Sequence, residues 1–346
     1  GRRVHVRPRL VQNPVPHPSS FSQDTTSTIF GKMPFLRRAF ENLKARLDEG
    51  EEPSHDEQAT MIPATILMIS GCRDAQTSAD VSNVQEFCLP DPAGKAGGAC
   101  TSALLRVLYN DERTPETDLS YVQVLEGLRD ELEDGFTQVP QLSSSRPFDL
   151  ENPFVIGAGT GTRRALLVGI NYVGTGGELS GCHNDVINIK KYIMEVHGFE
   201  EDNIVVLMDD GENAEPTGSN IMRELERLAE ESESGDSVFF HYSGHGASIR
   251  DDNGDEKDGM DEALCPIDYA TNGLLRDDTI YTSFIAAMQE GVRAICLMDC
   301  CHSGSIMDLP YTYRPGSGDN VFVQNPRFKF GKFLRIFGAA VREVFK

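Results

Sequence analysis

Short apolar runs alternate with longer amphipathic stretches through the second half of the chain. Apolar runs that end in small or polar residues are typical of buried strands, and the stretches between them have the period of amphipathic helices. Strands that alternate with helices indicate a parallel sheet covered by helices. We expect strands at 165–171, 203–208, 237–242 and 294–298, and helices at 185–197, 217–231 and 279–291.

The first half of the chain carries fewer elements. We expect a strand at 63–70, helices at 99–109 and 119–133, and a short strand at 138–143. Because Pro140 cannot donate to a strand ladder, the last strand is expected at an edge. Two strands and two helices make a poor independent core, so the two strands should complete the sheet of the second half. Amphipathic helices are also expected at 35–48 and near the C-terminus, over 330–345.

Composition narrows the class of protein. The chain has 346 residues and a net charge of −22, which argues against a nucleic-acid binder. No apolar run approaches the length of a transmembrane helix. The eight cysteines form no regular framework, which fits reduced thiols in a reducing compartment. We expect a cytoplasmic monomer, and the Arg-rich, acid-poor residues 1–34 leave an organelle-targeting segment as the alternative location.

A histidine and a cysteine follow two of the predicted strands. His245 stands in Ser-Gly-His-Gly after the strand at 237–242, and Cys301 stands in Asp-Cys-Cys-His-Ser-Gly after the strand at 294–298. A lone cysteine is usually a small buried hydrophobe, and a lone histidine between glycines is usually a turn residue. At one edge of a shared sheet, however, the two side chains can form a thiolate–imidazole pair. Cys300 and Cys301 lack the spacing of a metal-binding cysteine pair.

These motifs resemble those of the metacaspases in the caspase-like clan. The resemblance rests on Tyr-Ser-Gly-His-Gly at 242–246 and Asp-Cys-Cys-His-Ser-Gly-Ser at 299–305, and it extends over residues 162–312. It implies Cys301 as the nucleophile and His245 as the base of a cysteine endopeptidase. No third catalytic residue is evident, so we expect a dyad. Backbone N–H groups of Gly246 and Cys301 are the expected oxyanion donors.

The segment at 69–79, together with 138–143, resembles the metacaspase small subunit. It precedes the cysteine-bearing region, and this permuted order resembles the type III metacaspases. The implied fold is α/β, a caspase-like, mostly parallel sheet flanked by helices. The expected parts are an N-terminal extension with one amphipathic helix (1–60), a small-subunit-like region (61–150), a linker (151–162), a large-subunit-like catalytic region (163–312) and a C-terminal tail with an amphipathic helix (313–346).

The acids near the predicted strand ends bear on specificity. Asp185 and Asp299 could select Arg or Lys through charge-assisted hydrogen bonds, although Asp185 could instead cap a helix N-terminus. The resemblance maps a basic-residue pocket onto Cys182, Asp185, Ser243 and Asp299. It therefore implies protein or peptide substrates cleaved after Arg or Lys.

An acidic stretch raises the question of a metal ion. Residues 251–262 hold seven carboxylates and nearly match an EF-hand, but Glu256 occupies the position that needs glycine. A solvated loop is the simplest interpretation. The resemblance instead implies a calcium site, and hard carboxylate oxygens from separate loops suit Ca²⁺. The implied ligands are Asp261, Asp277, Asp278 and Asp308.

Other functions remain open at this point. A calcium-responsive pseudoprotease or scaffold, and another clan member with a different specificity, such as a paracaspase or a legumain-like protease that prefers Asn, are the alternatives. Self-processing is also expected at basic residues of the terminal segments. Examples are Arg38, Lys44, Arg327 and Lys332.

Overall fold

The structure is a computed structural model. The helices predicted at 35–48 and 330–345 and the four basic residues named for self-processing lie outside the part of the chain that it describes. Most of the acidic stretch, 251–259, and most of the small-subunit motif, 72–79, also lie outside it. The described residues are 54–55, 59, 62–71, 80–81, 97–109, 119–133, 139–250, 260–301, 303–304, 306–313, 322–325 and 328.

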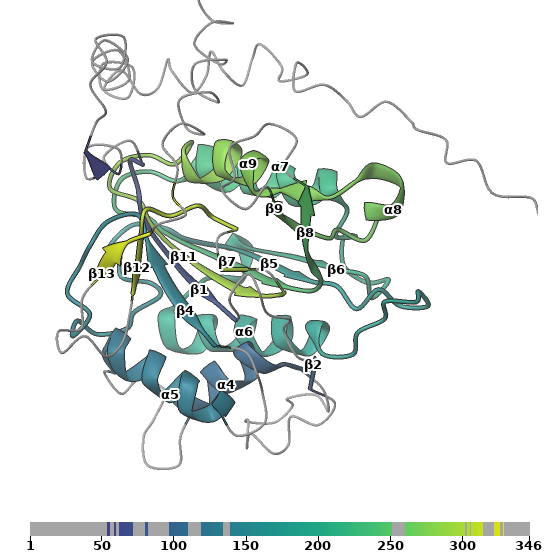
Figure 1. The fold of residues 1–346 in the computed structure, drawn as a ribbon, viewed down its shortest axis with the longest axis horizontal. Helices are drawn as coiled ribbons and strands as arrows, with labels where there is room; N and C mark the ends of the chain where they lie inside the picture. The colour runs from purple at the N-terminus through teal and green to yellow at the C-terminus, as the bar shows by residue number, and fades with distance from the viewer. Residues whose placement is uncertain are drawn as a thin grey trace, which may run out of the picture.

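An eight-stranded sheet forms the centre of the molecule (Figure 1). Its strand order is β13-β12-β4-β1-β11-β7-β5-β6. Each neighbouring pair in the series β1, β11, β7, β5 and β6 is parallel. The pairs β1–β4, β4–β12 and β12–β13 are antiparallel. The strand bounds are Thr65–Ser70 (β1), Gln141–Ser144 (β4), Arg163–Gly169 (β5), Ile204–Met208 (β6), Ser237–Ser243 (β7), Arg293–Asp299 (β11), Tyr311–Tyr313 (β12) and Phe322–Gln324 (β13).

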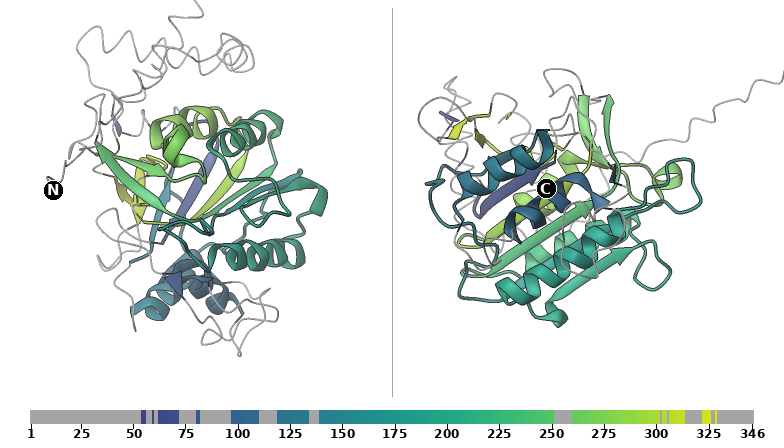
Figure 2. Two further views of the ribbon diagram at one scale, coloured as in Figure 1. Left: turned by 90° about the vertical axis from the view of Figure 1, so that its right-hand side faces the viewer. Right: turned by 90° about the horizontal axis from the view of Figure 1, so that it is seen from below.

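Helices cover both faces of this sheet, with α4, α5 and α6 on one side and α7 and α9 on the other (Figures 1 and 2). This is the mostly parallel sheet flanked by helices that the sequence predicts. The helix bounds are Ala99–Leu108 (α4), Tyr121–Glu133 (α5), Cys182–His197 (α6), Gly218–Glu231 (α7), Tyr269–Asn272 (α8) and Asp277–Ile280 (α9), with a 3-10 turn at Glu201–Asn203 and a π-helical turn at Tyr281–Ile285.

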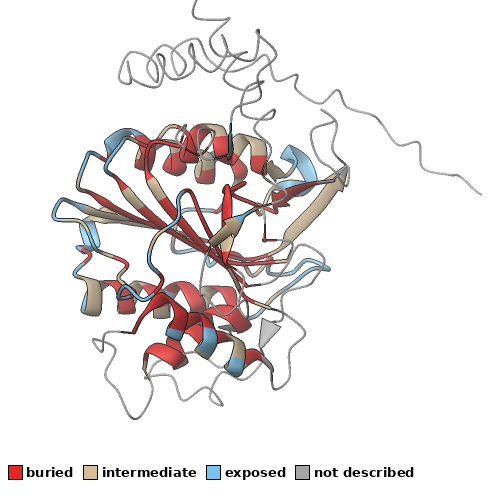
Figure 3. Ribbon diagram, turned by 60° about the vertical axis from the view of Figure 1, so that its left-hand side comes forward, coloured by how far each residue is buried: buried red, intermediate tan, exposed pale blue. Residues whose placement is uncertain are grey.

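The apolar runs of the central strands are buried on both sides. Along β11, Ala294, Cys296 and Met298 belong to the core beneath α7, whereas Ile295 and Leu297 belong to the core against α4, α5 and α6. Successive side chains of a strand point to opposite faces, so one continuous apolar run supplies two cores. Figure 3 shows the buried strands between the two helical layers.

Strands from the first half of the chain join the sheet, as predicted. β1 pairs in parallel with β11, with Thr65 opposite Arg293, and β4 pairs antiparallel with β1. The prediction that the strand near 138–143 lies at an edge was wrong, because β4 lies between β1 and β12. Pro140 comes just before the first ladder residue, Gln141, so its missing N–H interrupts no strand pairing.

Several elements were not predicted. A second, three-stranded antiparallel sheet holds Gly246–Arg250 (β8), Met260–Leu264 (β9) and Leu275–Arg276 (β10), and a two-stranded ladder joins Asp80–Val81 (β2) to Gly97–Gly98 (β3). The helix predicted at 279–291 was too long. Its helical backbone ends with the π-helical turn, and the left-handed Gly291, with a φ of +85°, helps to turn the chain back into β11.

Within the described part of the chain, none of the helices combines the length and the apolar character needed to cross a membrane.

Candidate active site

His245 and Cys301 follow two strands that are direct neighbours in the sheet. β7 and β11 run parallel, with Ser243 opposite Asp299 at their carboxyl ends, and each candidate residue comes two positions later. The backbones stay together beyond the strands, because a Cβ atom built on Gly246 would lie only 2.0 Å from the carbonyl oxygen of Cys301. The structure thus brings the two chain segments of the predicted dyad, and the two predicted oxyanion donors, to one edge of the sheet.

The imidazole of His245 has a defined orientation. Its Nε2 atom lies 2.7 Å from the carbonyl oxygen of Gly177. A carbonyl oxygen only accepts hydrogen bonds, so Nε2 carries the proton of the neutral ring and Nδ1 is the nitrogen able to take a proton. The ring also lies 4.7 Å, between centroids, from the ring of Tyr172, whose hydroxyl accepts the backbone N–H of His245 at 3.0 Å.

The burial of the cysteines separates Cys301 from the other thiols. Of the six described cysteines, Cys301 is half-buried and the remaining five are buried, Cys300 among them with an exposed fraction of 1%. Burial, reinforced by the neighbouring Cys301, raises the pKa of the Cys265 thiol to about 11. Burial also raises the pKa of the Cys296 thiol. Since the thiolate is the reactive form, accessibility favours Cys301 over Cys300 as a nucleophile.

The predicted specificity residues come together beside this pair. Gly169, Ser243 and Asp299 are in register at the ends of β5, β7 and β11, and the Ser243 hydroxyl donates to Asp185 Oδ2 at 2.6 Å. Cys182 begins α6 with its backbone against Gly169, where a Cβ atom would lie 2.7 Å from the Cys182 carbonyl oxygen. Asp185, Ser243, Asp299 and Cys182 are all buried. Two carboxylates therefore lie close to one sheet edge.

Sequence reasoning missed the part that α4 plays here. The backbone N–H of Thr101, in the first turn of α4, donates to Asp299 Oδ2 at 2.8 Å. The Thr101 hydroxyl lies 3.3 Å from Nε2 of His241, which is fully buried. Burial lowers the pKa of His241 to about 3, so this imidazole is neutral at physiological pH. No local pattern could predict this contact, because Thr101 and Asp299 are 198 positions apart.

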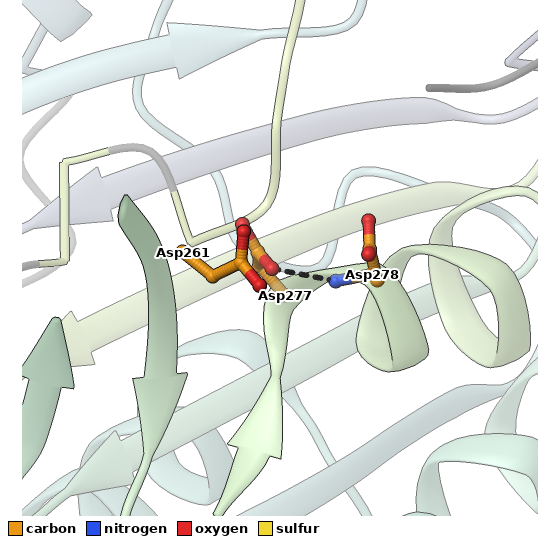
Figure 4. Close-up of side chains that lie close together, drawn as sticks. All are labelled: Asp261, Asp277 and Asp278. Atoms are coloured by element: carbon orange, nitrogen blue, oxygen red, sulfur yellow. Dashed lines mark hydrogen bonds between the residues drawn. The ribbon is translucent and has the colours of Figure 1, made fainter. Parts of the chain in front are cut away.

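Three of the four predicted metal ligands form a cluster. Asp261 on β9, with Asp277 and Asp278 of α9, place carboxylate oxygens within 4.8 Å of one another (Figure 4). The Asp278 N–H donates to Asp277 Oδ1 at 2.8 Å, and the guanidinium of Arg276 contacts Asp261. Asp308 is buried with a φ of +44° and lies outside this cluster.

The cluster fits a hard divalent cation. Its ligand atoms are all oxygens, and the side chains of Asp261 and Asp277 are fully buried. Buried carboxylates are costly unless a positive charge compensates them, and Arg276 supplies such a charge at Asp261. Oxygen ligands of this kind suit Ca²⁺ or Mg²⁺.

The comparison with known proteins points to one family. The family model described as the metacaspase peptidase C14 domain matches residues 163–310, and the caspase-domain model matches residues 15–150. Metacaspase III c of Phaeodactylum tricornutum is 54% identical over 282 residues, which are 80% of this chain and 84% of that protein.

Fungal relatives match a smaller part of the chain. Metacaspase-1 of Pyricularia oryzae is 46% identical over 156 residues, 44% of this chain and 39% of the relative. Metacaspase-1 of Saccharomyces cerevisiae is 42% identical over 165 residues, 47% of this chain and 38% of the relative.

Proposed function

This chain belongs to the metacaspase family of caspase-clan cysteine peptidases, and we propose that it cleaves proteins after Arg or Lys, with Ca²⁺ as an activator, through a dyad of Cys301 and His245. The observation that carries the proposal is the meeting of the two strand ends, with His245 Nε2 bonded to a carbonyl oxygen and Nδ1 left to accept a proton. The order of the two family matches, caspase domain first, is consistent with a small-subunit-like region that precedes the catalytic region.

In the proposed mechanism, Nδ1 of His245 removes the thiol proton of Cys301 and the thiolate attacks the scissile carbonyl carbon. The developing oxyanion accepts hydrogen bonds from the N–H groups of Gly246 and Cys301. The protonated imidazole then gives its proton to the leaving amine, and a thioester to Cys301 remains. Water, deprotonated by the same imidazole, hydrolyses the thioester and restores the thiol.

Specificity for a basic side chain follows from the two buried acids at this edge. The Ser243 hydroxyl donates to Asp185 Oδ2, and the Thr101 backbone N–H donates to Asp299 Oδ2. A substrate guanidinium would add charge-assisted hydrogen bonds to these buried carboxylates. Hydrogen bonds to charged groups contribute roughly 1.5–3 kcal/mol each, enough for strong discrimination against Asn or Asp at the cleaved position.

Asp261, Asp277 and Asp278 would hold the calcium ion, with Asp308 as a further candidate ligand from the segment that follows Cys301. When bound, the ion supplies positive charge that orders the loops joined to its ligands. Asp261 is in register with Ile249 on β8, the strand that begins directly after His245. Order at the cluster would therefore extend along β8 to the base.

The test is cleavage of peptide reporters with Arg, Lys, Asp or Asn at the cut position, in Ca²⁺ and in chelator. We expect the Arg and Lys reporters to be cleaved rapidly in Ca²⁺ and not in chelator. Cys301→Ala should lose all cleavage, and the matched variant Cys300→Ala should keep most of its activity. Cleavage by purified Cys301→Ala would refute the nucleophile, and equal rates in chelator would refute the calcium requirement.

Self-processing, a monomeric state and a cytoplasmic location stay predictions. Mass spectrometry after Ca²⁺ addition would identify any cut bonds, and light scattering with size-exclusion chromatography would give the mass in solution.

A further inference from the structure

The loop at 171–179 holds the imidazole of His245 through its Nε2 atom. The hydrogen bond between Nε2 and the Gly177 carbonyl oxygen sets the rotation of the ring, and hence the direction in which Nδ1 points. Residues 173–178 are exposed, so water competes for this bond. The carbonyl must therefore be held in place by the rest of the loop if the imidazole is to keep one orientation.

Internal hydrogen bonds give the loop its shape. The Leu179 N–H donates to the Asn171 carbonyl at 2.8 Å, which closes the loop, and the Thr175 N–H donates to the Tyr172 carbonyl at 3.0 Å. The Gly177 N–H donates to the Thr175 hydroxyl at 3.2 Å. These bonds fix the loop relative to itself, but they do not attach it to the sheet.

Asp209 provides an attachment to the sheet. It follows the last residue of β6, and its side chain is 8% exposed. Its Oδ1 accepts the Asn171 N–H at 2.8 Å, and its Oδ2 accepts the Val173 N–H at 3.3 Å. His183 on α6 donates from Nε2 to Oδ1 at 2.6 Å, which joins strand, helix and loop at one carboxylate.

The ionised form of this carboxyl is favoured. Burial by itself would raise its pKa, but the hydrogen bonds from His183 and from the two loop amides outweigh burial and lower the pKa of Asp209. An ionised carboxylate accepts at both oxygens, as the two amides require.

We propose that Asp209 is a positioning residue for the catalytic base: by holding the amides of Asn171 and Val173 it keeps the loop at 171–179, and with it the Gly177 carbonyl, in the position that orients His245. This inference rests on the proposed role of His245. In this role Asp209 acts on the imidazole through the loop amides that it holds.

The test compares Asp209→Asn with Asp210→Asn in the full chain. Asp210 is a matched control, because its carboxylate accepts hydrogen bonds from Glu212 and Asn213 within its own turn. The first measurement is the rate of iodoacetamide alkylation of Cys301 from about pH 5 to about pH 9, located by fragmentation mass spectrometry with Cys301→Ala as the blank. The second is kcat and KM for an Arg reporter in Ca²⁺.

For Asp209→Asn we expect the alkylation profile to move towards that of an unpaired thiol, with a pKa of about 8.5. We also expect kcat to fall by about 10- to 100-fold while KM changes by less than about twofold. Asp210→Asn should match the wild type in both measurements.

A folded Asp209→Asn variant with the wild-type alkylation profile would overturn the proposal. So would equal effects of Asp209→Asn and Asp210→Asn, since those would reflect a general loss of stability. If Asp209→Asn does not fold, Thr175→Val removes the acceptor of the Gly177 N–H at an exposed position, and an unchanged profile there would overturn the role of the loop. Alkylation needs no peptide cleavage, so the two proposals can fail separately. A wild-type protein whose alkylation profile is that of a thiol paired with an imidazole, but which cuts no reporter, would refute the proposed function and leave the role of Asp209 standing.

Discussion

Gly246 is the position where the active-site backbone leaves no room for a side chain. Its φ is not positive, so the backbone conformation does not itself require glycine. A Cβ atom there would lie 2.0 Å from the carbonyl oxygen of Cys301, 3.0 Å from its carbonyl carbon and 3.4 Å from the sulfur of Cys300. The change Gly246→Ala therefore acts through steric contact alone.

The size of the effect follows from this overlap. An ordinary contact needs about 3.4 Å, so the Cys301 backbone or β8 must move by more than about 1 Å. A misplacement of about 1 Å at reacting groups costs about 100-fold in rate, which corresponds to about 2.7 kcal/mol in activation free energy. Overpacking of this kind also lowers the free energy of unfolding by about 1–3 kcal/mol.

The assay is kcat/KM for an Arg reporter, with the melting temperature of each variant measured alongside. Gly176→Ala is the matched control, because it lies in the loop beside His245 and a Cβ atom there has nothing within 4 Å. We expect Gly246→Ala to lose at least about 100-fold in kcat/KM and Gly176→Ala to stay near the wild type. A Gly246→Ala variant with wild-type kcat/KM would refute the inferred closeness of β8 to the Cys301 segment.

Three further predictions test other parts of the structure. Arg276→Gln removes a positive charge from the carboxylate cluster, and the repulsion between two positive charges about 4 Å apart is up to about 4 kcal/mol. The Kd for Ca²⁺, measured by calorimetry, should therefore fall at least about tenfold, and weaker or unchanged binding would contradict this. Asp185→Asn should lower kcat/KM for an Arg reporter by about 100- to 1000-fold and leave thiol alkylation unchanged, whereas full activity would exclude the carboxylate from the pocket. Burial alone would raise the pKa of Asp236, but amide hydrogen bonds and Arg164 lower it below the ordinary 3.8. Its stabilisation is therefore present above about pH 4 and lost as the pH falls through the lower folded-state pKa, so urea unfolding should show Asp236→Asn destabilised at neutral pH and less so in acid.

The order of strands within the sheet is where sequence reasoning was weakest. The bounds of β5, β6, β7 and β11 were predicted to within two residues. The joining of strands from the first region to the sheet was also predicted. β12, β13 and the β8–β9–β10 sheet were missed because short strands that alternate weakly have no distinct period. The position of β4 was wrong because a proline before a strand says nothing about its neighbours.

At the candidate active site, too, some residues could be predicted from the sequence and others could not. The motifs around His245 and Cys301 could be interpreted from the sequence, because each follows a strand and parallel strands end at a common edge. Tyr172 lies within residues 162–312, over which the family resemblance extends, yet its contact with His245 was not predicted. Gly177 and Asp209 gave no signal in the sequence at all.

Local period and residue chemistry were enough to predict the class of fold, the strand ends that carry the thiol and the imidazole, and the acidic segments available to a cation. The folded chain was needed to show which amide meets Asp299, which carbonyl orients His245, and that Arg276 lies on the carboxylate cluster. Each of the first two contacts joins segments distant in sequence, and the third depends on how β9 and β10 pair. Such pairings follow from the packing of the whole sheet, and no local pattern encodes them.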